Sequence, residues 1–176
     1  MNCVFKYGGG FMYEVGKYVV HNGHGVCKIN AIIEANPNEN FYNLIAISNN
    51  MSIKMSCDKA ANFLRPILTY DNLTKILDNA YLLSSKYIKD NKERKNQFQK
   101  LISSNDINDS LTLLKMICNL AYDKKNEKKT LGTIDTHFLQ QVERKLIFEI
   151  AIVYDLKPLD SKKLIYEKIN FNYENS

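Results

Sequence analysis

The stretch that decides the fold begins MYEVGKYVVHNGHGVCKINAII (residues 12–33) and ends NFLRP (residues 62–66). Within it, short apolar runs alternate with turns rich in Gly and Asn, and the first two runs flank residues 22–25. Gly supplies the positive φ that tight turns require, and Asn tolerates it. The runs at 18–20 and 26–33 are therefore predicted to be paired strands, with a bulge or strong bend late in the second.

Two further strands are predicted at 41–47 and 51–55. The turn-rich segment 36–40 precedes them and the turn 48–50 separates them. Four or five short, curled strands in so few residues are typical of a small SH3-like or Tudor-like barrel.

After Pro66 the apolar residues recur at helical spacing. We expect one helix capped by Asp71, a second over about 89–101, and a third after Ser104-Asn105-Asp106. A charged loop at 123–129 precedes a long fourth helix, and Asp160 is expected to cap a last one. The predicted fold class is α+β, an N-terminal small Tudor/SH3-like β-barrel (12–66) followed by a C-terminal all-α helical domain (67–176). Residues 1–11 fit neither domain and are interpreted as a flexible lead-in or an upstream start.

The chain has 176 residues, 45% of them hydrophobic, a formal net charge of +5 and a sequence pI of about 8.9. This charge favours a polyanionic partner. Its four cysteines (Cys3, Cys27, Cys57 and Cys118) have no paired spacing, and no signal peptide precedes them. Reduced thiols in a cytoplasmic protein are therefore expected, and no apolar run approaches the roughly 20 residues of a membrane helix.

The positive charge is concentrated in residues 86–129, where eleven Lys and Arg residues outnumber six acidic ones. Lysines on a helix face and in a loop suit contacts to nucleic-acid phosphates, which position a protein without reading sequence. A solvated helix face that binds nothing fits the same composition, so both interpretations stay open.

A metal site is the other chemistry that the sequence raises. His21, His24 and Cys27 have a suggestive spacing, but no second cluster completes four ligands. Alternation along an extended chain also separates the two histidines, unless the turn refolds them. A turn-stabilising imidazole is the preferred interpretation. Since no nucleophile elbow, P-loop or dinucleotide fingerprint occurs, we expect no enzyme activity. A metal-dependent protein that uses the two histidines and Cys27 stays as an alternative.

A family resemblance follows from the order of several motifs. These are Tyr13-Glu14-Val15-Gly16, Val19-Val20, His24-Gly25-Val26, Phe41-Tyr42-x-Leu44, Met51-x-Ile53-Lys54 and Phe63-Leu64-Arg65-Pro66. In this order they make residues 12–169 similar to the CarD/CdnL family of bacterial RNA-polymerase-binding transcription regulators. The resemblance implies a Tudor-like domain that docks on the RNA polymerase β subunit and a helical domain that contacts promoter DNA. Such proteins modulate open-complex stability, use no cofactor or small-molecule substrate, and lie in the cytoplasm, associated with the nucleoid through RNA polymerase.

The resemblance also implies roles for particular residues. Lys54 falls where the family places a basic polymerase-contacting residue on the fourth strand. The resemblance and the basic stretch together predict a set of DNA-contacting residues, which are Lys89, Lys92, Arg94, Lys95, Lys124 and Lys125.

One departure from the family concerns tryptophan. Relatives often place a Trp wedge at the start of the basic helix, and this chain has no Trp. The position falls near Asp90, whose carboxylate would repel phosphate, and Tyr87 is the nearest aromatic substitute. Weaker kinking of DNA is therefore expected. An adaptor without a DNA role, similar to the polymerase-binding module of transcription-repair coupling factors, is the alternative. The affected promoters, the sign of the effect and the oligomeric state stay open.

Overall fold

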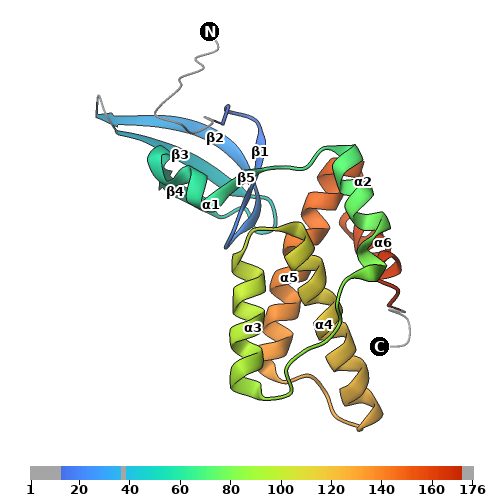
Figure 1. Cartoon of the computed structure of the whole chain (residues 1–176). Helices are drawn as coiled ribbons and strands as arrows, with labels where there is room; N and C mark the ends of the chain where they lie inside the picture. Colours follow the sequence, from blue (N-terminus) through green and yellow to red (C-terminus); the bar gives the residue numbers. More distant parts are fainter. Residues whose placement is uncertain (1–12, 37–38, 172–176) are drawn as a thin grey trace. The chain divides into compact units, whose positions relative to one another are not determined.

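The computed structural model describes residues 13–36 and 39–171 of the chain, and the predicted lead-in at 1–11 lies outside them. The chain divides into two compact units, Met1–Ile67 and Leu68–Ser176. Strands form the first unit and helices form the second (Figure 1). The predicted α+β class, with strands preceding helices, is confirmed.

The first unit is a five-stranded antiparallel sheet in the order β4-β3-β2-β1-β5. Its strands are β1 (Tyr18–His21), β2 (Gly25–Asn36), β3 (Glu39–Ala46), β4 (Ser52–Ser56) and β5 (Leu64–Pro66). The pairings in the described residues leave β4 and β5 as the two edges of this sheet. Closure into the predicted barrel therefore stays a prediction.

Strand β2 is long and irregular, as its sequence predicts. Its register against β3 shifts between Ile29 and Ala31 and again between Glu34 and Asn36. A bulge of this kind bends a strand and increases its twist. The bend accompanies an apolar core on one face of the sheet, where Ile29, Tyr42 and Leu44 are buried.

The chain between β4 and β5 contains helical turns that the sequence pattern did not predict. A 3-10 turn at Cys57–Lys59 (η1) continues into the four-residue helix α1 (Ala60–Phe63). Ala60 is buried against the sheet core. Four residues are too few for a helical period to show in a sequence, which explains the omission.

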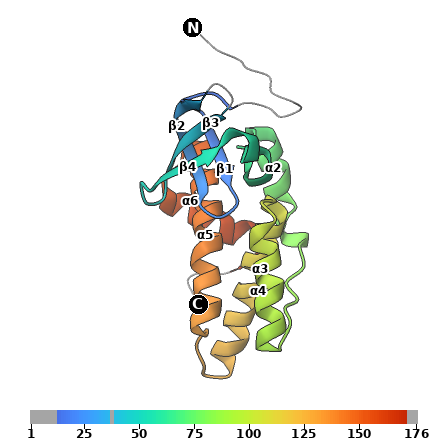
Figure 2. The same cartoon turned by 90° about the vertical axis from the view of Figure 1, so that its left-hand side faces the viewer.

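The second unit is built from helices, and α3, α4 and α5 run alongside one another in both views (Figures 1 and 2). Phe98, Leu114 and Leu146, one from each of these helices, are buried in its core.

In the described residues no helix is both long and apolar enough to cross a membrane. The helical segments are α2 (Tyr70–Asp78), η2 (Ala80–Leu82), α3 (Asn91–Ser103), α4 (Ile107–Asn126), α5 (Thr133–Tyr154) and α6 (Pro158–Lys168).

Two of the predicted helix starts are wrong, one by two residues and the other by three. Helix α2 is capped by Thr69, whose side chain accepts a hydrogen bond from Asn72 N, and Asp71 lies in the first turn. Helix α6 begins at Pro158, and Asp160 likewise lies in its first turn. Proline suits a first turn because its missing N–H would have no partner there.

The predicted charged loop at 123–129 is also corrected. Helix α4 continues to Asn126, so Asp123, Lys124 and Lys125 are helical. The helix ends because Lys128 adopts a left-handed φ of 57°, and Lys129 N then donates back to Lys124 O at 2.7 Å. The lysines at this end are therefore held on an ordered framework.

Candidate functional site

Lys54 lies on the edge strand β4, with an exposed side chain. It pairs with Asn43 of β3, and its Nζ lies 4.4 Å from the centroid of the Phe41 ring. This is within the range of a cation–π contact, which holds the ammonium group over the ring. Lys54 is thus a positioned cation on an accessible edge.

An apolar strip adjoins Lys54 on the same face of the sheet. Ile33 pairs with Phe41, and Phe41 pairs with Ser56, so these side chains share one face. Ile33 is 40% exposed. In the described residues no strand pairs with the outer edge of β4, and such an edge can accept a strand from another chain.

Helix α3 presents part of the predicted basic set. Lys92 and Lys95 are exposed three residues apart on this helix, so they lie near the same face, and exposed Lys89 precedes it. Asp90 is the N-cap, because its carboxylate accepts hydrogen bonds from Lys92 N at 3.0 Å and Glu93 N at 2.9 Å. The carboxylate near the position where the sequence comparison expects a tryptophan wedge thus has a structural role here.

Arg94 does not belong to this exposed set, and its burial does not support the DNA contact predicted for its side chain. Its side chain is 7% exposed, and its Nη2 lies 3.0 Å from Asp135 Oδ2. The guanidinium also donates to the carbonyl of Lys89 and to Asn91 Oδ1. Through these bonds Arg94 links the start of α3 to α5. A signal was present in the sequence, because Arg94 shares its helix face with buried Phe98 and Ile102.

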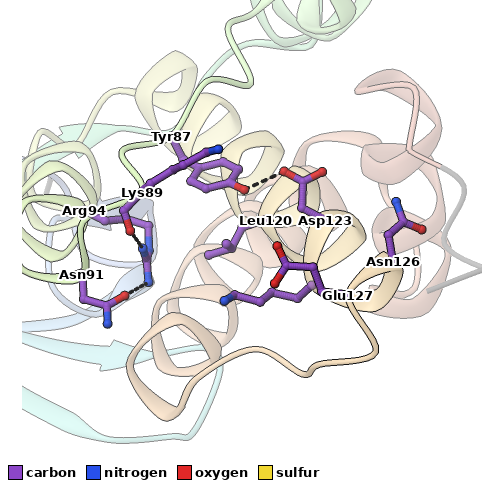
Figure 3. A pocket seen from close by; sticks show the side chains of 9 residues that line it. Tyr87, Lys89, Asn91, Arg94, Leu120, Asp123, Asn126 and Glu127 are labelled. Carbon is purple, nitrogen blue, oxygen red and sulfur yellow. Dashed lines mark hydrogen bonds between the residues drawn. The ribbon is translucent and has the colours of Figure 1, made fainter.

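Tyr87 borders a cavity of about 480 Å³ between the chain that precedes α3 and the end of α4 (Figure 3). Its hydroxyl donates to Asp123 Oδ2 at 2.6 Å. Burial, together with this acceptor, raises the pKa of Tyr87 to about 12. A ring anchored in this way has to break its hydrogen bond before it can act as a wedge.

The remaining lysines of the predicted set divide between two cavities. Lys89 and Lys124 line the cavity that Tyr87 borders, so the structure brings these three together. Lys125 follows Lys124 on the helix and lines a different cavity of the same unit. Successive helical residues point about 100° apart, so neighbours in sequence do not share a face.

Other lysines in the helical unit support its fold. Lys145 is buried, and its Nζ donates to the carbonyl of Ile102 at 2.8 Å. Lys115 donates to the carbonyl of Tyr81, and burial lowers its pKa. The positive charge counted in the sequence is therefore larger than the charge available to a partner.

The His21 imidazole stabilises the first turn, as predicted. Gly23 N donates to His21 Nδ1 at 3.0 Å, and the turn brings the rings of His21 and His24 to a centroid distance of 4.7 Å. Burial raises the pKa of the Cys27 thiol to about 12, which disfavours the thiolate that binds metal. In the described part of the chain no three His, Cys, Asp or Glu residues are grouped as metal ligands.

The comparison with protein families matches the sheet unit and the residue that follows it. Residues 13–68 match the model of the family described as the CarD-like/TRCF RID domain, and the match ends before α2 begins at Tyr70. No curated protein matches the chain.

Proposed function

Because residues 13–68 belong to the CarD-like family of RNA-polymerase-interacting domains, we propose that this protein is a transcription regulator that binds the RNA polymerase β subunit and promoter DNA. Domains of this family interact with that subunit. The sheet unit carries the first contact in this proposal, and the helical unit carries the second. The protein then changes how stably the melted promoter complex persists, without catalysis of its own.

The single observation that carries the polymerase half is the environment of Lys54. An exposed ammonium group over the Phe41 ring lies on an edge strand beside a partly exposed Ile33. An edge of this kind supports docking by strand pairing, with apolar contact from the strip and charge complementarity from the lysine. We therefore propose acidic groups on the polymerase surface that faces Lys54.

The DNA half of the proposal is supported by the exposed lysines of the helical unit. Lys92 and Lys95 lie on α3 and Lys89 precedes it, while Lys124 lies near Lys89 at the edge of the shared cavity. Flexible lysines of this type suit phosphate contacts, which provide affinity without reading bases. Arg94 positions the start of α3 instead of contacting DNA.

The first experiment measures binding of the full chain to purified RNA polymerase and to its isolated β subunit. Lys54→Glu is expected to weaken binding by about tenfold or more, because it places a carboxylate against an acidic surface. Lys28→Glu is the matched control. Lys28 is exposed on the same sheet, and its Nζ lies 5.9 Å from the Tyr18 ring centroid, so the same charge change is made over a second aromatic ring.

Three outcomes decide the proposal. Loss of binding in Lys54→Glu alone supports docking at the β4 edge. Equal losses of polymerase binding in both variants would attribute the effect to net charge. If both variants bind as tightly as wild type, the contact does not involve Lys54. Absence of wild-type binding to the β subunit overturns the proposal.

A polymerase-binding adaptor without a DNA role is the second candidate. Two observations favour it, the burial of Arg94 and the carboxylate of Asp90 at the start of α3. Fluorescence anisotropy with a promoter fragment at low and moderate salt separates the two. Polymerase binding that persists without DNA binding would select the adaptor.

A further inference from the structure

A second, larger cavity of the helical unit has features that neither proposed contact uses. It has a volume of about 810 Å³ and is lined by the C-terminal part of α4, the chain that follows it, Thr136 of α5 and the turn after α6. Small-molecule sites in proteins commonly have volumes of about 300–1,000 Å³. The cavity is therefore large enough for a ligand of one base and one sugar phosphate.

Two aromatic rings border this cavity. Tyr122 belongs to α4 and is 59% exposed, while Phe171 follows α6. Leu131 adds a further apolar side chain to the wall. Aromatic rings at an accessible site provide stacking surfaces for a planar ring, and such stacking tolerates different bases.

The charge at the cavity wall is of one sign. Among the described residues that line it, the ionised side chains are Lys125 and Lys129, with no carboxylate. The smaller cavity differs, because its wall includes Asp123 and Glu127. A ligand that occupies the larger cavity is therefore expected to carry negative charge.

Lysines near a helix C-terminus also stabilise the helix, because their positive charge interacts favourably with the helix dipole. This stabilisation is a simpler role for the two lysines of the cavity wall. That role fits Lys125, in the last turn of α4, better than Lys129, which lies beyond the helix end. Lys129 Nζ pairs with Glu127 at 3.0 Å, and these side chains are 63% and 55% exposed. Ion pairs this exposed contribute little to stability, so Lys129 can turn to a bound phosphate.

Amide and hydroxyl groups complete the lining. Asn126 and Asn170 offer both donors and acceptors, and Thr130 and Thr136 offer hydroxyls. These are the groups that hydrogen-bond the edges of a nucleobase and the hydroxyls of a ribose. Neither a purely apolar ligand nor a bare phosphate would use the whole set.

The wall is built before any ligand arrives. Asn170 has a left-handed φ of 57°, and Phe171 N then donates to Tyr166 O at 2.9 Å. The rings of Phe171 and Tyr166 pack with centroids 5.9 Å apart. The turn at Lys128 fixes the backbone of Lys129 in the same manner. Preorganisation of this kind lowers the entropy cost of binding.

From these features we infer that the cavity binds a nucleoside monophosphate, with the base against Tyr122 and Phe171 and the phosphate near Lys125 and Lys129. This inference does not rest on the proposed polymerase role, because it concerns the helical unit alone. It adds a small-molecule site to a chain whose other proposed partners are macromolecules.

The test is titration of the full chain, without polymerase or DNA, by isothermal calorimetry and by amide chemical shifts in NMR. The probes are AMP, GMP, guanosine and inorganic phosphate. We expect one or both nucleotides to bind with a Kd below about 1 mM, and guanosine and phosphate to bind at least about tenfold more weakly, because each supplies half of the contacts.

Matched variants locate the site. Tyr122→Ala is expected to weaken nucleotide binding by about tenfold, while Tyr81→Ala, at a tyrosine that is 50% exposed and outside the cavity, leaves it unchanged. Lys125→Gln/Lys129→Gln should weaken it similarly. Lys157→Gln/Lys163→Gln removes the same charge from exposed positions of the helical unit outside this cavity, so it should bind normally. Circular dichroism and thermal unfolding verify that each variant folds.

Several results would overturn the inference. They are the absence of binding by either nucleotide in the millimolar range, binding of phosphate as tightly as of nucleotide, and equal losses in the paired control variants. Failure of polymerase binding in the earlier experiment would leave this inference intact, since the two tests share no component except the chain.

Discussion

In the sheet unit, the lysine selected from the sequence lies exposed on an edge strand, whereas in the helical unit the selected arginine lies in the interior. Lys54 keeps its ammonium group at the surface over the Phe41 ring. Arg94 is only 7% exposed and is held by Asp135 and by backbone carbonyls of the preceding segment. A basic side chain is therefore available to a partner in the sheet unit, whereas in the helical unit one is buried in an ion pair.

The difference between Lys54 and Arg94 shows that a count of basic residues in the sequence overestimates the positive charge available to a partner. A run of basic residues on an amphipathic helix includes those that face the core, and these contribute to stability instead of binding. Lys145 and Arg94 both donate to groups of other segments. A basic surface is therefore better estimated from residues off the apolar face, which on α3 are Lys92, Lys95 and Lys100.

The largest expected effect tests this division directly. Arg94→Met should lower the free energy of unfolding of the helical unit by about 3–5 kcal/mol, because it leaves the Asp135 carboxylate buried without its counter-ion. Urea unfolding followed by circular dichroism measures this. Lys95→Met, on the exposed side of the same helix, should change stability by less than about 0.5 kcal/mol.

A double variant sharpens the same comparison. Arg94→Met with Asp135→Leu removes both charges and should recover part of the lost stability, since no unpaired carboxylate remains. If Arg94→Met unfolds at the wild-type urea concentration but loses DNA binding, then Arg94 contacts DNA and the structural role proposed for it is wrong.

The strands and helices could largely be predicted because their signals are local. Gly and Asn turns mark the β1–β2 hairpin, and Asp106 caps α4 where the sequence predicts a helix start. The cap of α3 by Asp90 was not predicted, because the helix was expected to begin at about residue 89. The starts of α2 and α6 were misplaced because an aspartate in the first turn resembles an N-cap in sequence, while Thr69 and Pro158 mark the true starts. Helix α1 is too short to leave a periodic pattern.

The candidate sites were less predictable because they depend on contacts between distant segments. Arg94 and Asp135 are 41 residues apart in sequence, and no local pattern connects them. The position of Lys54 could be predicted, since alternation along a strand assigns it to the face opposite the core. The Tyr122 cavity could not, because its wall comes from four separate segments.

The second effect concerns DNA. Lys92→Gln/Lys95→Gln should weaken binding to a promoter fragment by about tenfold at low salt and reduce the salt slope by roughly 0.9 for each phosphate that the variant no longer neutralises. Lys157→Gln/Lys163→Gln removes equal charge from exposed positions at α6 and should change affinity by about twofold at most. Equal losses of DNA affinity in both double variants would show that DNA responds to the overall positive charge of the protein and not to a specific surface on α3.

A smaller effect should follow from Tyr87. Burial and the Asp123 carboxylate raise its pKa from 10.0 to about 12, so the folded state keeps a proton that the unfolded chain loses between these values. The stabilisation is therefore present below pH 10 and is lost as the pH rises toward 12. Tyr87→Phe should cost about 1 kcal/mol at neutral pH and abolish this loss. Unfolding at several pH values measures it, with exposed Tyr122→Phe as the control.

The smallest effect separates the two roles of Asp90, as a cap and as a charge beside Lys89 and Lys92. Asp90→Asn retains an N-cap oxygen for Lys92 N and Glu93 N, so stability should change by less than about 0.5 kcal/mol, whereas Asp90→Ala should cost about 1 kcal/mol. DNA affinity should rise about twofold in Asp90→Asn, because a carboxylate that repels phosphate is removed.

Asp106→Asn is the matched control, since Asp106 caps α4 by accepting a hydrogen bond from Asn108 N at 2.7 Å. It removes the same charge from the same kind of cap, away from the start of α3. A gain in DNA affinity in Asp90→Asn that is absent in Asp106→Asn would place the DNA backbone near the beginning of α3. Equal affinity in both variants and wild type would instead place the DNA backbone away from the beginning of α3.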